Sequence, residues 1–233
     1  MSSQKKHAVV SHQEWLAARE AFLVEEKAHM RRGDELARKR RELPWEKVEK
    51  TYVFEGPRGK ATLAELFGKH GQLIVYHFMF PPEDDAGCKH CSFWADNFNG
   101  IDIHLAHRDA AFAAISRAPV GKLEAFKRRM SWSFPWWSSH GTDFNYDHQA
   151  SFSPEQIASG KAYYNYKAQE IDLADREGIS IFYKDGRGDV FHTYSCYARG
   201  IEVVNGAYHF IDLLPKGRDE GDHPQSWVRY HDR

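Results

Sequence analysis

Hydrophobic and polar residues alternate along this chain in blocks that have the length of a strand or a short helix. The longest continuous apolar block spans residues 73–80, and a second one spans 110–116. Runs of this kind are typical of strands buried on both faces of a parallel sheet. A helical pattern covers about 91–107, with a break expected near Gly100, and Pro119 opens another amphipathic helix. This β-α-β-α order predicts a parallel sheet with helical crossovers.

The second half of the chain contains a hairpin pattern. Two apolar runs, 179–183 and 189–194, flank a turn that contains Asp185 and Gly186. A last helix is expected over about 197–214. We therefore expect an α/β fold with a mixed central sheet, in three α/β/α layers.

The N-terminal part has a different pattern. Ser11 and Glu14 have capping-box spacing and open a charged helix that runs to about Arg40, before Pro44. Its apolar edge is formed by Trp15, Ala18, Phe22 and Leu23. Its second half is basic, so a solvated helix is the first interpretation and a nucleic-acid or partner-binding helix is the alternative.

These changes of pattern divide the chain into three parts. We expect a charged helical extension at 1–43, a folded domain at 44–220 and a polar tail at 221–233. At 233 residues the chain can bury a substantial core.

Composition and charge exclude several classes of function. The formal net charge is −1 at pH 7, so no overall field attracts nucleic acid or anionic lipid. No apolar run approaches the roughly 20 residues of a membrane span, and residues 1–10 do not have the pattern of a secretory signal. We therefore expect a cytoplasmic protein with no nucleic-acid or membrane partner and no cofactor.

Three cysteines are too few for a disulfide framework. Cys88 and Cys91 form a C-x-x-C pair, and in a reducing compartment such a pair is catalytic or metal-binding more often than structural. Cys196 follows the hairpin and is interpreted as a small buried residue, with a third redox thiol as the alternative.

The position of the pair favours redox chemistry. Cys88 lies where a buried strand leads into a helix, and free backbone N–H groups there favour a thiolate. Lys89 and His90 add positive charge, which further favours the thiolate. We predict Cys88 as the attacking thiolate and Cys91 as the resolving thiol.

Two other interpretations compete with the redox one. Cys88, Cys91, His104 and His107 approach the spacing of a zinc finger, although the last two are closer than usual. The alternative for His104 and His107 is a solvated helix face, and His77, inside a buried run, is expected to be a hydrogen-bonded core residue. A non-catalytic zinc module or scaffold therefore stays open.

Several long motifs carry a resemblance to a known family. They are VYHFMF at 75–80, GCKHCS at 87–92, SRAP at 116–119, RRM at 128–130, WWSS at 136–139, DFNY at 143–146, FHTYS at 191–195, ARG at 198–200 and DLLPKGRDE at 212–220. On these motifs the chain resembles the thioredoxin-like domain-of-unknown-function family 899, whose members are predicted dithiol–disulfide oxidoreductases. The resemblance implies a thioredoxin-like fold and a redox role for Cys88 and Cys91.

The family is also similar in layout to peroxiredoxins, with two departures in this chain. Thioredoxins have a cis-proline before the hairpin strand, where this chain has Glu177 and Gly178 before Ile179. Peroxiredoxins hold peroxide with a proline-threonine-x-x-cysteine turn, which residues 85–87 before Cys88 do not supply.

The prediction is a thiol–disulfide oxidoreductase, with a peroxiredoxin-type thiol peroxidase as the alternative enzyme. Its substrate would be a protein or small-molecule disulfide or thiol, and homo-oligomerisation stays open. Arg176, His192 and Tyr194 lie beside or on the expected hairpin and are predicted to approach the cysteines and to support the thiolate. Structural hydrogen bonding is the alternative for these three.

Overall fold

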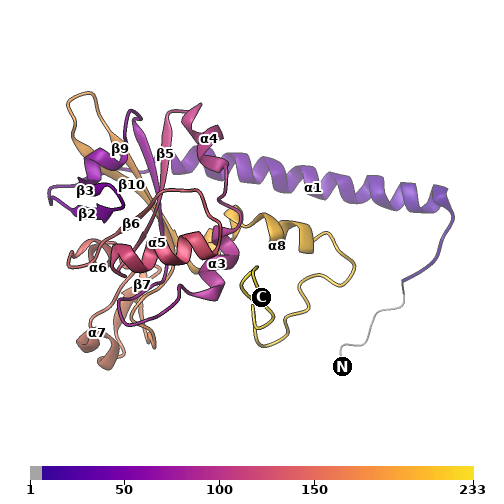
Figure 1. The fold of residues 1–233 in the computed structure, drawn as a ribbon. Helices are drawn as coiled ribbons and strands as arrows, with labels where there is room; N and C mark the ends of the chain where they lie inside the picture. The colour runs from indigo at the N-terminus through magenta and orange to yellow at the C-terminus, as the bar shows by residue number, and fades with distance from the viewer. Residues whose placement is uncertain (1–6) are drawn as a thin grey trace. The chain divides into compact units, whose positions relative to one another are not determined.

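The structure, a computed structural model, describes residues 7–233, so most of the segment 1–10 assessed for a secretory signal lies outside the described residues. The chain forms two compact units, Met1–Pro44 and Trp45–Arg233, which are described separately. The first unit contains the long helix α1 (His12–Arg40; Figure 1). This helix begins with the predicted Ser11–Glu14 capping box and has no buried residue. None of the helices in the described part combines the length and hydropathy needed to cross a membrane.

Within Trp45–Arg233, eight strands form one mixed sheet in the order β1-β10-β9-β4-β5-β6-β2-β3. Its strands are β1 (Glu46–Lys47), β2 (Val53–Gly56), β3 (Gly59–Thr62), β4 (Gln72–His77), β5 (Ala110–Ser116), β6 (Trp136–Ser138), β9 (Gly178–Lys184) and β10 (Val190–Tyr197). Strands β4 and β5 are parallel, whereas β9 is antiparallel to both β4 and β10. The order β10-β9-β4-β5 with these directions is the core of a thioredoxin-like fold, as predicted.

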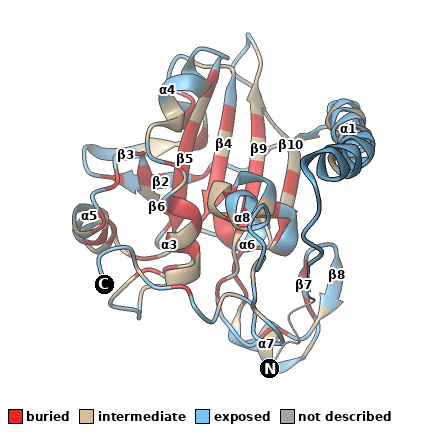
Figure 2. Cartoon of the chain, turned by 90° about the vertical axis from the view of Figure 1, so that its right-hand side faces the viewer, coloured by how far each residue is buried: buried red, intermediate tan, exposed pale blue. Residues whose placement is uncertain are grey.

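Short helices cover both faces of the sheet and complete the three layers. They are α2 (Leu63–Leu66), α3 (Lys89–Ala95), α4 (Ile101–Ala106), α5 (Val120–Arg129), α6 (Phe144–Asp147), α7 (Pro154–Ala158), the 3₁₀ helix η1 (Ala198–Val204) and α8 (Gly206–Ile211). Ile74 and Tyr76 of β4 pack in the cluster that contains residues of α3, α5 and α8. Leu73 and Val75 pack in the cluster on the other face, with α2 and α6. The central strands carry much of the buried chain (Figure 2).

Two details of the helices bear on the predictions. The break near Gly100 is confirmed, because Gly100 has a left-handed backbone (φ 82°) between α3 and α4. The single last helix expected over 197–214 is wrong. The chain there forms η1 and then α8, because the Asn205 side chain accepts a hydrogen bond from the N–H of Tyr208 and caps a new helix.

Candidate functional site

The loop after β4 places Cys88 at the start of α3. The backbone N–H of Cys88 donates to the carbonyl of Met79 (3.0 Å), and the N–H of Met79 donates to Sγ of Cys91 (3.4 Å). The hydroxyl of Ser92 donates to the carbonyl of Cys88 (2.9 Å). The loop and the first turn of α3 therefore hold each other in place.

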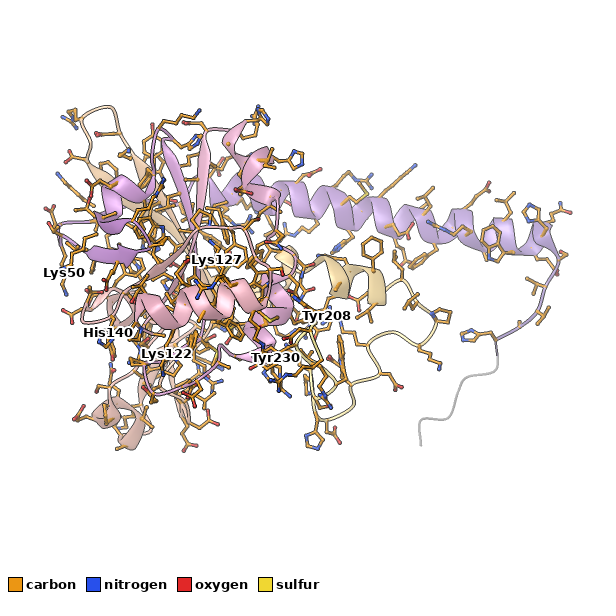
Figure 3. The ribbon with its side chains drawn as sticks, in the orientation of Figure 1. Lys50, Lys122, Lys127, His140, Tyr208 and Tyr230 are labelled. Atoms are coloured by element: carbon orange, nitrogen blue, oxygen red, sulfur yellow. The ribbon has the colours of Figure 1, made fainter. Side chains whose placement is uncertain are left out.

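Gly87 is the tightest point of this loop. A Cβ at this position would lie 2.6 Å from Cε1 of Phe78 and 2.9 Å from Cε1 of Phe126. The carbonyl of Gly87 accepts a hydrogen bond from the hydroxyl of Tyr230 (2.7 Å). Tyr230, labelled in Figure 3, lies near the end of α5 and contacts Arg129. A glycine is therefore required beside Cys88 by close packing.

The two thiols differ in exposure and in electrostatics. Cys91 is 2% exposed, whereas Cys88 is partly exposed, and no disulfide joins them. A hydrogen bond from the Cys91 thiol, helped by the His90 ring and the backbone N–H of Cys91, lowers the pKa of Cys88 to about 4 despite its burial. Burial, and then the neighbouring Cys88, raise the pKa of Cys91. These shifts favour the thiolate form of Cys88 and the protonated form of Cys91.

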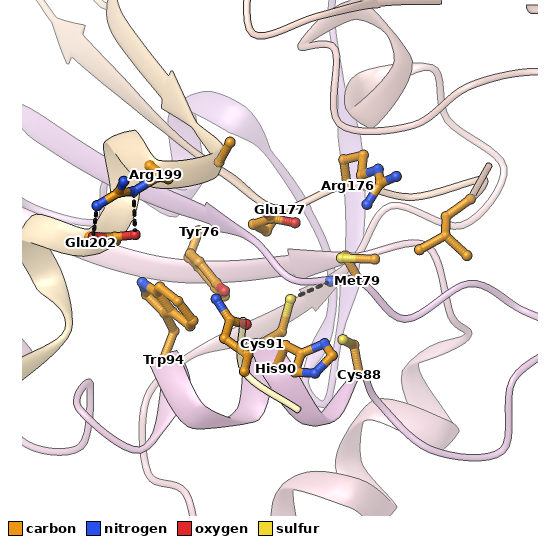
Figure 4. Close-up of a pocket in the computed structure, with 13 residues that line it drawn as sticks. Tyr76, Met79, Cys88, His90, Cys91, Trp94, Arg176, Glu177, Arg199 and Glu202 are labelled. Atoms are coloured by element: carbon orange, nitrogen blue, oxygen red, sulfur yellow. Dashed lines mark hydrogen bonds and ion pairs between the residues drawn. The ribbon is translucent and has the colours of Figure 1, made fainter. Parts of the chain in front are cut away.

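Both sulfurs line a pocket of about 290 Å³ (Figure 4). Its apolar wall includes Tyr76, Met79 and Trp94. Its charged wall consists of residues from the segment before β9 and from η1, namely Arg176, Glu177, Arg199 and Glu202. The pocket therefore offers a small, partly enclosed space with both signs of charge beside the thiolate.

Two groups in this pocket were not predicted as functional. Burial is the main reason for the raised pKa of Cys91, but the negative charge of Glu177 adds to it. The buried hydroxyl of Tyr76 interacts with the Cys91 sulfur. The sequence did carry a signal for Glu177, because it stands directly before the hairpin strand, where thioredoxins have the cis-proline that faces the disulfide. Tyr76 had none beyond its place in an apolar run.

The structure brings together some of the predicted supporting residues. Lys89 and His90 lie in the first turn of α3, and His90 and Arg176 line the pocket. His192 and Tyr194 of β10 are not among the residues that line it.

His192 belongs instead to a polar chain on the other face of the sheet. Its Nε2 lies 2.7 Å from the hydroxyl of Ser195, which lies 2.8 Å from that of Ser180, which lies 2.9 Å from Nε2 of His77. His77 is fully buried, which confirms the prediction of a hydrogen-bonded core histidine. A contribution of His192 to the thiolate is therefore not supported by its position.

The zinc alternative is not supported by the geometry. His104 lies in α4 and His107 directly follows it. No group of three or more His, Cys, Asp and Glu side chains in residues 7–233 is arranged to hold a metal ion. Cys196 on β10 packs against the same apolar cluster as Tyr76.

Comparisons with known proteins place the chain beside one family. Residues 4–233 match the family described as "Bacterial protein of unknown function (DUF899)". No curated protein matches the chain.

Solved structures similar to this chain include three bacterial proteins. Peroxidoxin BcpB from Mycobacterium tuberculosis is 14% identical, with 70% of this chain and 94% of that chain covered and a TM-score of 0.44. The bacterioferritin comigratory protein from Xanthomonas campestris is 14% identical, with coverages of 71% and 94% and a TM-score of 0.46. A PrxQ mutant from Xylella fastidiosa is 11% identical, with coverages of 68% and 89% and a TM-score of 0.43.

Proposed function

This chain belongs to the DUF899 family of bacterial proteins, and we propose that it is a thiol–disulfide oxidoreductase whose redox group is the dithiol of Cys88 and Cys91. The observation that carries the proposal is the contrast between the two sulfurs. Cys88 is partly exposed and its lowered pKa favours the thiolate, whereas Cys91 is buried and its raised pKa favours the thiol, and both line one pocket. A nucleophile next to a shielded resolving thiol is the arrangement that dithiol exchange requires.

In the proposed reaction the protein reduces a substrate disulfide. The Cys88 thiolate attacks one substrate sulfur, a mixed disulfide forms, and the other substrate sulfur leaves as a thiolate. Cys91 then attacks Sγ of Cys88 and releases the second half of the substrate as a thiolate. The substrate gains two electrons, the protein gains a Cys88–Cys91 disulfide, and an external thiol reductant restores the dithiol.

The second step requires a base, because Cys91 attacks as a thiolate and its raised pKa keeps it protonated. We assign this role to Glu177, which lines the same pocket and acts electrostatically on Cys91. The hydroxyl of Tyr164 donates to the backbone carbonyl of Glu177 (3.0 Å), which fixes the backbone of this residue.

The pocket also favours a certain kind of substrate. At about 290 Å³ it fits a small disulfide or the tip of an extended peptide. Arg176 and Arg199 on its charged wall can bind a substrate carboxylate in exchange for the ion pairs that they form with Asp172 and Glu202. A reducing compartment such as the cytoplasm is where the dithiol would be regenerated.

Trapping of the mixed disulfide tests the proposal. The Cys91→Ser variant, incubated with oxidised glutathione, is expected to retain one glutathione on Cys88, identified by peptide mass spectrometry. The wild type is expected to show the Cys88–Cys91 disulfide, and Cys196→Ser is expected to behave as the wild type. Absence of any adduct on Cys88 would contradict the proposal. Oxidation of Cys88 by hydrogen peroxide but not by the disulfide would instead support a thiol peroxidase.

A further inference from the structure

Helix α1 carries an apolar stripe with a regular repeat. Its members are exposed, and they are Trp15, Leu16, Phe22, Leu23, Met30 and Leu36. Trp15–Leu16 and Phe22–Leu23 are adjacent pairs seven residues apart. Met30 and Leu36 continue the repeat at positions 29–30 and 36–37, where their neighbours are His29 and Ala37. A seven-residue repeat keeps one face of a helix against a partner helix along its length. At 29 residues α1 is about 44 Å long, which is long enough for an extended helix pair.

The repeat is symmetric about the middle of the helix. Glu26 is the central residue of His12–Arg40. The pair at 22–23 lies as far before Glu26 as the pair at 29–30 lies after it, and the same holds for 15–16 and 36–37. Two copies of α1 that run antiparallel and cross at Glu26 would therefore place Phe22 of one copy level with Met30 of the other, and Leu16 level with Leu36.

The charges of α1 are distributed in the matching way. Before Glu26, three of the four Asp, Glu, Lys and Arg residues of the helix are acidic, and after it six of the eight are basic. An antiparallel pair puts each acidic half beside a basic half, whereas a parallel pair would put like charges together. Glu20 and Arg31 are an example, because they lie on the same side of the stripe, six residues before and five residues after Glu26. In an antiparallel pair Glu20 of one copy therefore lies near Arg31 of the other.

We propose that α1 is a dimerisation helix that binds α1 of a second copy of this chain in an antiparallel pair with its two-fold axis at Glu26. The interface is isologous, since each copy presents the same stripe. The apolar residues supply the buried surface, and the charges of the two halves set the direction. The ion pair of Arg19 with Glu26 within each copy (2.6 Å) offsets the repulsion of the two Glu26 carboxylates that meet at the axis.

Measurement of the mass of the full chain in solution tests the proposal. Sedimentation equilibrium is expected to give twice the chain mass of 27.0 kDa. Phe22→Asp places a charge on the stripe and is expected to give the single-chain mass. Val24→Asp is the matched control, because Val24 is exposed on the opposite side of the same helix, and this variant is expected to stay dimeric. A monomeric wild type, or a Phe22→Asp variant that stays dimeric, would overturn the proposal. A wild type that is monomeric and binds duplex DNA would overturn it too, and would indicate a nucleic-acid-binding helix instead.

Thiol cross-linking tests the direction of the pair. Glu26→Cys puts a thiol at the proposed two-fold axis and is expected to form a disulfide between two copies, detected as a cross-linked peptide containing position 26. Gly33→Cys lies on the same side of α1, but in the antiparallel pair it faces Arg19 of the second copy, so little cross-linking is expected. Equal cross-linking at both positions would show a parallel pair and overturn the proposed arrangement.

Discussion

Cys88 and Cys91 have opposite electrostatic surroundings although two residues separate them. The C-x-x-C spacing and the strand-to-helix turn are the basis on which the sequence predicts a thiolate at Cys88, and the direction of its pKa shift agrees with that prediction. The side chains that act on Cys91 come from distant parts of the chain, Tyr76 on β4 and Glu177 before β9. Such contacts depend on sheet order and not on local pattern, so the sequence predicted the pair but not its surroundings.

The role of Glu177 predicts a specific defect. Glu177→Gln removes the charge, so release of the second half of the substrate is expected to slow by about tenfold to a hundredfold at pH 7, while the first attack by Cys88 is retained. Stopped-flow detection of the mixed disulfide measures both steps. Glu170→Gln, an exposed carboxylate in the segment before it, is the control. Equal slowing of both steps, or of neither, would argue against this role.

At the scale of elements, the sequence predicted what local patterns determine. The strands at β4, β5, β9 and β10 were expected close to their observed bounds, because each is a short apolar run flanked by turn residues. The hairpin of β7 (Ala162–Tyr164) and β8 (Lys167–Gln169) was missed. Its turn has positive φ at both Asn165 and Tyr166. The usual sequence signal for such a turn is Asn-Gly, and this chain has tyrosine in place of the glycine.

The loop that leads into α3 carries the next prediction. Gly87→Ala is expected to destabilise the protein by about 1–3 kcal/mol, because the new methyl group overlaps Phe78 and Phe126. It is also expected to displace Cys88 and slow its alkylation. Gly121→Ala in α5 is the control, because nothing lies within 4 Å of its added methyl group. Urea unfolding of both variants measures the difference, and an equal stability would show that the packing at Gly87 is loose.

At the scale of the whole second unit, the two faces of the sheet differ in chemistry. One face carries the cysteine pocket, and the other carries His77, His148 and His192 close together, with the rings of His148 and His192 5.2 Å apart. Burial, and then the neighbouring histidines, lower the pKa of His77 well below its usual range and that of His148 to about 3. The folded protein therefore keeps both residues neutral.

This difference predicts how stability depends on pH. Below pH 6.5 the unfolded chain binds protons at His77 and His148 that the folded protein does not, so stability is full above about pH 6.5 and falls as pH decreases. Each group is expected to cost about 1.4 kcal/mol per pH unit in this range. Urea unfolding at pH 7, 6 and 5 measures the slope. His148→Leu is expected to reduce the slope of stability against pH by about 1.4 kcal/mol per pH unit, the contribution of one group. An unchanged slope would contradict the linkage.

The proposed function depends above all on a Cys88 thiolate that Cys91 stabilises, and the first measurement is the rate of Cys88 alkylation as a function of pH. Mass spectrometry of the iodoacetamide-labelled peptide would follow Cys88 separately from Cys91 and Cys196. We expect a titration midpoint well below the ordinary cysteine value of about 8.5 and a higher midpoint in Cys91→Ala, which lacks the donating thiol. A midpoint at or above about 8.5 in the wild type would contradict this expectation.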